Sequence, residues 1–177
     1  MSATPKDLHN AILDAFKAKF GERIKTYGAY RPFETAPIKT PAILLNLEDA
    51  GLGEDIGDKR TPMLWQVTLH CILSFQTPDV EVAIRDFASQ VFRMVPYNKW
   101  GLGSDVSFPS QQDLHAGPGE FKEGKHGFES WYVTWPQTLY LGESLWDEEE
   151  FVIADVYVGS DPELQTGDGD FRKISDY

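Results

Sequence analysis

The sequence contains one cysteine, Cys71, so no disulfide can form within the chain. It also lacks any stretch approaching the roughly 18 consecutive apolar residues that span a bilayer. The first residues carry no apolar core of the kind found in signal peptides. We therefore expect synthesis in the reducing cytosol and no membrane association.

Basic residues are scarce as well. Lys and Arg number 16 against 28 Asp and Glu, which gives a net charge of -12. The densest basic groups, residues 59–60 and 172–173, are flanked by acids and have no interleaved aromatic residues. A surface that neutralises phosphates or stacks bases is therefore not expected, and sequence-specific nucleic-acid binding is disfavoured.

Motifs that carry chemistry are absent from the sequence. There is no phosphate-binding loop, no dinucleotide fingerprint between a strand and a helix, and no metal-ligand spacing of His or Cys. We therefore predict no catalytic residue, no cofactor and no metal, and a protein that is not an enzyme. A small enzyme with a dispersed active site stays open as an alternative, with His70 as its first candidate residue. Cys71 lies in an apolar alternation and is predicted to be a small buried hydrophobe.

Two amphipathic helices are predicted. Thr4 and Pro5 have the features of an N-cap and first helical residue, and Gly21 supplies a stop. Between them, apolar residues recur four apart, at Leu8, Ile12, Phe16 and Phe20. The second helix is expected to be capped at Thr77-Pro78 and to run from residue 80 to 95 with one broad apolar face. Each helix therefore has one face to bury.

Alternation of apolar and polar residues predicts strands over residues 41–47, 63–75 and 128–141. The acidic, Gly-rich stretch 48–58 and most of residues 97–127 have loop composition. Because Pro136 cannot donate a ladder hydrogen bond, the last strand is expected to lie at a sheet edge or to contain a bulge. The sequence thus predicts an α+β fold, a mainly antiparallel β-sheet with two amphipathic helices packed on one face.

The C-terminal region differs from the rest in charge. Residues 145–177 hold ten acids against two bases, a net of -8 out of the total -12. The strand-like run 151–158 interrupts these acids, and it either pairs within its own sheet or adds to a neighbouring subunit. We therefore predict an α+β body over residues 1–142 and an acidic C-terminal arm over residues 143–177.

The order of these elements, together with the Trp-x-Val-x-Trp-x-Gln run at 131–137 and the segment 156–163, resembles the tail terminator, or tail completion, proteins of long-tailed phages. The resemblance is to the group in contractile, Mu-like tails and spans most of the chain. It implies a virion structural protein that forms a ring, a hexamer, on the last ring of the tail tube. Such a ring ends polymerisation and joins the tube to the neck or head connector.

The resemblance also implies the partners: further copies of this chain, the tail tube protein and a neck or connector protein, with the sheath as a further candidate. DNA would pass through the lumen without specific binding, and acidic loops lining that lumen would keep it from sticking. The protein would reside in the virion tail after assembly in the host cytoplasm. The alternative within the same machine is another neck or tube ring component.

Subunit contacts are predicted from the residues themselves. The aromatic strand expected at the sheet edge and the strand-like run of the arm would supply them, through Trp131, Trp135, Pro136, Phe151, Val152, Ile153, Val156 and Tyr157.

Overall fold

A computed structural model describes residues 2–31, 38–122, 127–145, 157–159 and 171–173. The chain divides into two compact units, Met1–Ser144 and Leu145–Tyr177. The first unit, called the body below, contains the elements α1 (Pro5–Phe20), η1 (Gly21–Arg23), β1 (Thr26–Ala29), β2 (Ala42–Leu52), β3 (Thr61–Ser74), α2 (Val80–Phe92), η2 (Gly103–Asp105), β4 (His115–Lys122) and β5 (Phe128–Leu141). In the second unit, β6 (Tyr157–Gly159) pairs antiparallel with β7 (Phe171–Lys173).

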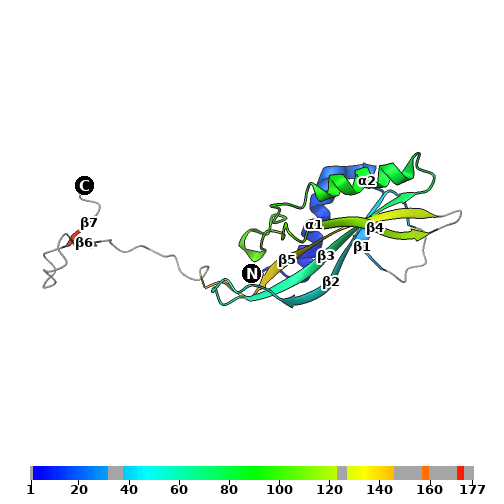
Figure 1. Cartoon of the computed structure of the whole chain (residues 1–177). Coiled ribbons are helices and arrows are strands. Elements are labelled where there is room, and N and C mark those ends of the chain that lie inside the picture. The colour runs from blue at the N-terminus through cyan, green and yellow to red at the C-terminus, as the bar shows by residue number, and fades with distance from the viewer. Residues whose placement is uncertain (1, 32–37, 123–126, 146–156, 160–170, 174–177) are drawn as a thin grey trace. The chain divides into compact units, whose positions relative to one another are not determined.

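The body is built on a five-stranded sheet with the strand order β1-β2-β3-β5-β4 (Figure 1). Only β1 and β2 pair in parallel, and the other neighbours are antiparallel. The predicted α+β class with a mainly antiparallel sheet is confirmed. β2 is longer than predicted, because it continues to Leu52 through part of the expected loop 48–58, and a register shift between Leu47 and Asp49 accommodates Glu48.

The first helix follows its sequence signals closely. Asp7 N donates to the Thr4 hydroxyl at 3.3 Å, and Thr4 N donates to the Asp7 carboxylate at 2.9 Å, which completes a capping box. The predicted stripe of Leu8, Ile12, Phe16 and Phe20 is buried.

The second helix begins at the predicted residue, but its N-cap and its last residue differ from the prediction. It begins at Val80 after Asp79, which has a left-handed backbone and makes no side-chain cap. Thr77 is used in a turn instead, since its N–H donates to Ser74 O at 2.9 Å. The helix ends at Phe92 because Met94 and Val95 close tighter turns onto Val91 and Phe92.

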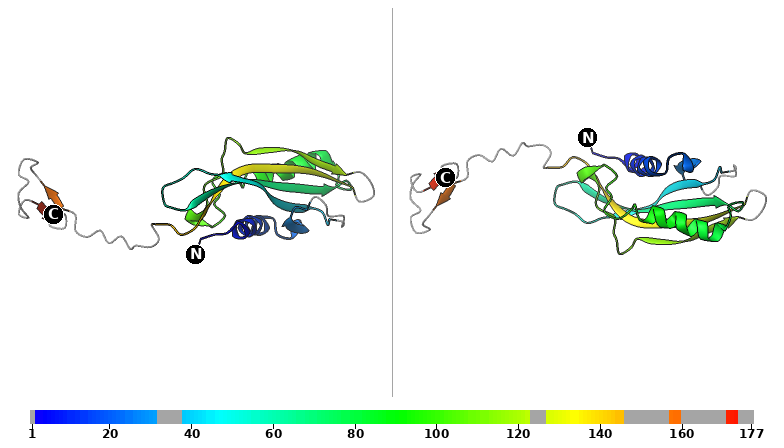
Figure 2. Two further views of the ribbon diagram at one scale, coloured as in Figure 1. Left: turned by 90° about the horizontal axis from the view of Figure 1, so that it is seen from below. Right: turned by 90° about the horizontal axis from the view of Figure 1, so that it is seen from above.

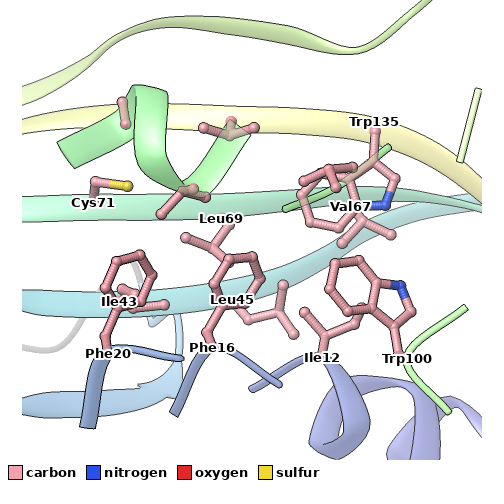
Figure 3. Packing of buried hydrophobic residues seen from close by; sticks show 14 of the residues in the cluster. Ile12, Phe16, Phe20, Ile43, Leu45, Val67, Leu69, Cys71, Trp100 and Trp135 are labelled. Carbon is pink, nitrogen blue, oxygen red and sulfur yellow. The ribbon is translucent and has the colours of Figure 1, made fainter. Parts of the chain in front are cut away.

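Both helices cover the same face of the sheet, as predicted, and build one apolar core against it (Figures 2 and 3). Phe20 of α1 meets Phe87 of α2 edge-on, with ring centroids 6.0 Å apart. Beneath the helices lie the inward-facing residues of β2, β3 and β5, including Ile43, Leu45, Val67, Leu69, Cys71 and Trp135 (Figure 3).

The strand β4 was not predicted, because Gly117, Pro118 and Gly119 gave its segment a loop composition. The structure explains these residues by close approach. A Cβ on Gly117 would lie 2.9 Å from the Tyr132 hydroxyl, and one on Gly119 would collide with the Ser130 hydroxyl. β4 is also the last strand of the sheet, where Pro118 is tolerated. Glycine and proline here mark an edge strand that neighbouring side chains approach closely.

Candidate functional site

The strand β5 does not lie at a sheet edge, so the predicted edge position is wrong, whereas the predicted subunit contacts stay a prediction. β5 pairs with β3 along its whole length and with β4 over its first half. Pro136 lies beyond the point where β4 stops, which is at the pair His115 and Thr134. There the loop after η2 replaces a strand, and Ser110 N donates to Pro136 O at 3.0 Å. A proline is tolerated inside the sheet because a loop faces it.

The predicted interface tryptophans have different environments. Trp135 is fully buried and packs against Trp100, with ring centroids 5.9 Å apart, so its side chain offers no surface to a partner in this fold. Trp131 is partly exposed, and the guanidinium of Arg85 lies 5.4 Å from its ring centroid. Phe151, Val152, Ile153 and Val156 lie outside the described residues, and Tyr157 is the first residue of β6.

A buried glutamine organises the aromatic core beside β5. Gln137 Oε1 accepts hydrogen bonds from Trp100 Nε1 at 2.8 Å and from Trp135 Nε1 at 3.1 Å. Its Nε2 donates to Asn98 O at 3.2 Å and to Ser107 O at 2.9 Å. One side chain thus partners two indoles and ties residues 98–107 to the sheet, which is a structural role. In the sequence, Gln137 was notable only as the end of the Trp-x-Val-x-Trp-x-Gln run, because its partners Trp100, Asn98 and Ser107 are distant in the chain.

The residues first considered for chemistry are used in packing. Cys71 is completely buried, and burial raises the pKa of its thiol, which makes the reactive thiolate scarce. The His70 imidazole stacks on the Tyr30 ring, with centroids 4.0 Å apart. Within the described ranges no group of three His, Cys, Asp or Glu side chains is placed to hold a metal ion.

A buried ion-pair network joins four segments at one end of the body. Arg60 Nε lies 2.6 Å from Asp58 Oδ2, and Arg60 Nη1 lies 3.0 Å from Asp105 Oδ1. The other Asp105 oxygen accepts from Ala3 N at 2.8 Å. The guanidinium carbon of Arg60 also lies 5.1 Å from the Tyr140 ring centroid. This network fixes the β2–β3 loop against η2, the N-terminal segment and the end of β5.

We expect Asp58 to make the stability of the body sensitive to acid. Burial alone would raise the pKa of Asp58, but hydrogen bonds from Arg60 and its charge outweigh burial and hold this pKa below its usual value. A carboxyl group whose pKa is lower in the folded state than in the unfolded state stabilises the fold at pH values above its unfolded-state pKa. This stabilisation is lost as the pH falls below about 5 and on through the folded-state pKa.

Urea unfolding between pH 7 and pH 3 tests this. Asp58→Asn should have a lower free energy of unfolding than the wild type at pH 7, and this difference should decrease toward pH 3. The control Asp86→Asn changes an exposed carboxylate on α2 and should show no such difference. Parallel pH curves for the wild type and Asp58→Asn would contradict the role of this pair.

The loop fixed by Arg60 presents apolar side chains to solvent. Leu52 is 82% exposed and Ile56 is 51% exposed. Around them lie the exposed acids Glu48, Asp49, Glu54 and Asp55. We call this set the hairpin surface. Apolar side chains within a charged surround are typical of the centre and rim of protein interfaces. In the sequence, Leu52 and Ile56 were two isolated apolar residues in an acidic loop, a signal too weak to single them out.

In the described part of the chain, neither helix has the length and apolarity needed to cross a membrane. No protein-family model matches the sequence, and a search of curated proteins finds no significant match.

Proposed function

We propose that this protein is a ring-forming assembly component of a phage tail that caps the tail tube, ends its polymerisation and joins it to the neck. The resemblance of the Trp-x-Val-x-Trp-x-Gln run, residues 131–137, supports the family. The observation that carries an assembly role is the hairpin surface, where exposed apolar side chains are held by the buried Arg60 network. Exposed apolar groups on a rigid support are a common basis for protein association.

The environments of the side chains that are capable of chemistry favour this assembly role over catalysis. The thiol of Cys71 is buried, and His70 is stacked against an aromatic ring. The strongly negative chain, at -12, also suits a ring through which DNA passes without specific binding. In this proposal the protein works through its surfaces and takes no substrate.

Electron microscopy of tails assembled with and without the protein tests the function. We expect tubes formed without it to extend well beyond the normal length and to lack a joined neck, because nothing ends their polymerisation. Adding back the full-length wild-type protein should restore the normal length. Tubes of normal length in its absence would contradict termination, and would favour the alternative of another neck or tube ring component.

The same assay can test the hairpin surface. Leu52→Glu with Ile56→Glu should fail to restore tube length, because a charged residue replaces each apolar contact. Val82→Glu is the matched control, since Val82 is a 58% exposed apolar residue on α2, away from the hairpin. Equal failure of both variants would contradict a specific role for the hairpin surface.

A further inference from the structure

Positive charge gathers near the beginning of β2, at the other end of that strand from the hairpin. Five exposed cations lie at the end of α1, in η1 and beside the beginnings of β1 and β2, namely Lys17, Lys19, Arg23, Lys25 and Lys39. They are brought together by the fold, since Lys25 N donates to Pro41 O at 2.8 Å and the Thr26 hydroxyl donates to Lys39 O at 2.7 Å. We call this set the basic end.

Helix capping explains only part of the basic end. Arg23 donates to Phe20 O and Lys19 O, and Lys25 donates to Glu22 O, which satisfies carbonyls near the end of α1. Within the described ranges, the ion pairs of 4.0 Å or less are those of Arg60, in the β2–β3 loop. The side chains of Lys17, Lys19 and Lys39 therefore have charge available for a partner.

The acids of the hairpin surface lie in the second half of β2 and in the loop that follows it. β2 has 11 residues and begins beside Lys25 and Lys39, and Glu48 and Asp49 lie in its second half. At about 3.3 Å per residue, the strand separates its two ends by roughly 35 Å. Glu143, also exposed, follows the end of β5, where Leu141 pairs with Thr61. Figure 2 shows the β2–β3 hairpin at one end of the body and the end of α1 well separated from it along the sheet.

We infer that the basic end binds the hairpin surface of a second copy of this chain, head to tail. The two surfaces have opposite charge, and the hairpin surface adds the exposed apolar groups of Leu52 and Ile56. A two-fold symmetric dimer through either surface would place like charges together. A head-to-tail contact instead uses two different surfaces of each subunit and closes into a ring when the rotation permits. This inference rests on the ring of the proposed function, and it specifies which surface of one subunit contacts which surface of the next.

Charge reversal tests the inference with full-length protein. Variant A carries Lys17→Glu, Lys19→Glu and Lys39→Glu, and variant B carries Glu48→Lys, Glu54→Lys and Glu143→Lys. All six side chains are exposed. Control variant C reverses three exposed acids on the helices, Asp14→Lys, Glu81→Lys and Asp86→Lys. Association is measured by analytical ultracentrifugation at low and high salt, and circular dichroism verifies that each variant is folded.

We expect wild-type self-association to weaken at least about tenfold between 0.05 and 0.5 M salt. Variants A and B should each lose self-association by about tenfold or more, since each then presents like charges at both ends. An equimolar mixture of A and B should recover it, because acidic ends again meet basic ends. Variant C should stay within about threefold of the wild type.

Several outcomes would overturn the inference. These are no self-association of the wild type up to about 1 mM, a mixture of A and B no stronger than either alone, or a loss in C equal to that in A and B. Binding of a DNA duplex that is lost in A, with self-association unchanged, would also overturn it and assign the basic end to nucleic acid. The two proposals can also fail separately. If self-association depends on these charges but tubes assembled without the protein have normal length, the inference is supported and the proposed function is contradicted.

Discussion

Replacing Trp135 with alanine is expected to lower the free energy of unfolding by about 3 to 5 kcal/mol. The side chain is fully buried among the residues under α1, with Trp100 tilted against it (Figure 3). Its removal leaves a cavity that the surrounding sheet cannot fill, and Gln137 loses one donor. Urea unfolding followed by tryptophan fluorescence and circular dichroism measures the change.

Trp131→Ala is the matched control, because Trp131 lies four residues earlier on the same face of β5. It is partly exposed and its ring is covered by Arg85. We expect a loss of about 1 kcal/mol from the cation–π contact and the partial burial. If Trp135→Ala lowered the free energy of unfolding no more than Trp131→Ala, the placement of Trp135 in the core would be contradicted. The sequence prediction that Trp135 contacts another subunit would then be favoured.

Replacing Gln137 with leucine is expected to cost about 3 to 5 kcal/mol, a large effect for a change that keeps the side chain's size. Leucine offers neither an acceptor for the indole N–H groups of Trp100 and Trp135 nor a donor for Asn98 O and Ser107 O. Each buried group left without its partner costs about 1 to 3 kcal/mol, and local relaxation recovers part of this total.

Gln66→Leu provides the comparison for Gln137. Gln66 lies on the other face of the sheet, is partly exposed, and donates to the Thr134 hydroxyl at 2.5 Å. Thr134 keeps its hydrogen bond to Val67 O, so the expected cost is below about 1 kcal/mol. Equal costs for the two leucine variants in urea unfolding would contradict the organising role of Gln137.

The elements with strong local signals were predictable from the sequence. The capping residues Thr4 and Asp7 and the terminating Gly21 marked α1, and long alternations marked β3 and β5. Two strands of the body, β1 and β4, were not predicted, and β4 depends on a distant partner. Gly117 signals a loop unless one knows that Tyr132 lies over it, and this contact arises only when β4 and β5 pair.

The candidate site was less predictable for a related reason. Alternation shows that Trp131 and Trp135 share a face, but it does not show whether helices cover that face. Trp135 is buried because Trp100, 35 positions earlier, is brought onto it by Gln137. Leu52 and Ile56 became notable only when the position of their loop, held by Arg60, was known.

The hydrogen bond from Gly142 N to the Ser2 hydroxyl, at 3.1 Å, brings the two ends of the body together. A short flexible linker could therefore join residue 144 to residue 2, and new ends could be opened in an exposed loop. Circular permutation of the body is thus geometrically permitted. A tag fused at the N-terminus would therefore emerge beside Gly142, near the point where the body ends.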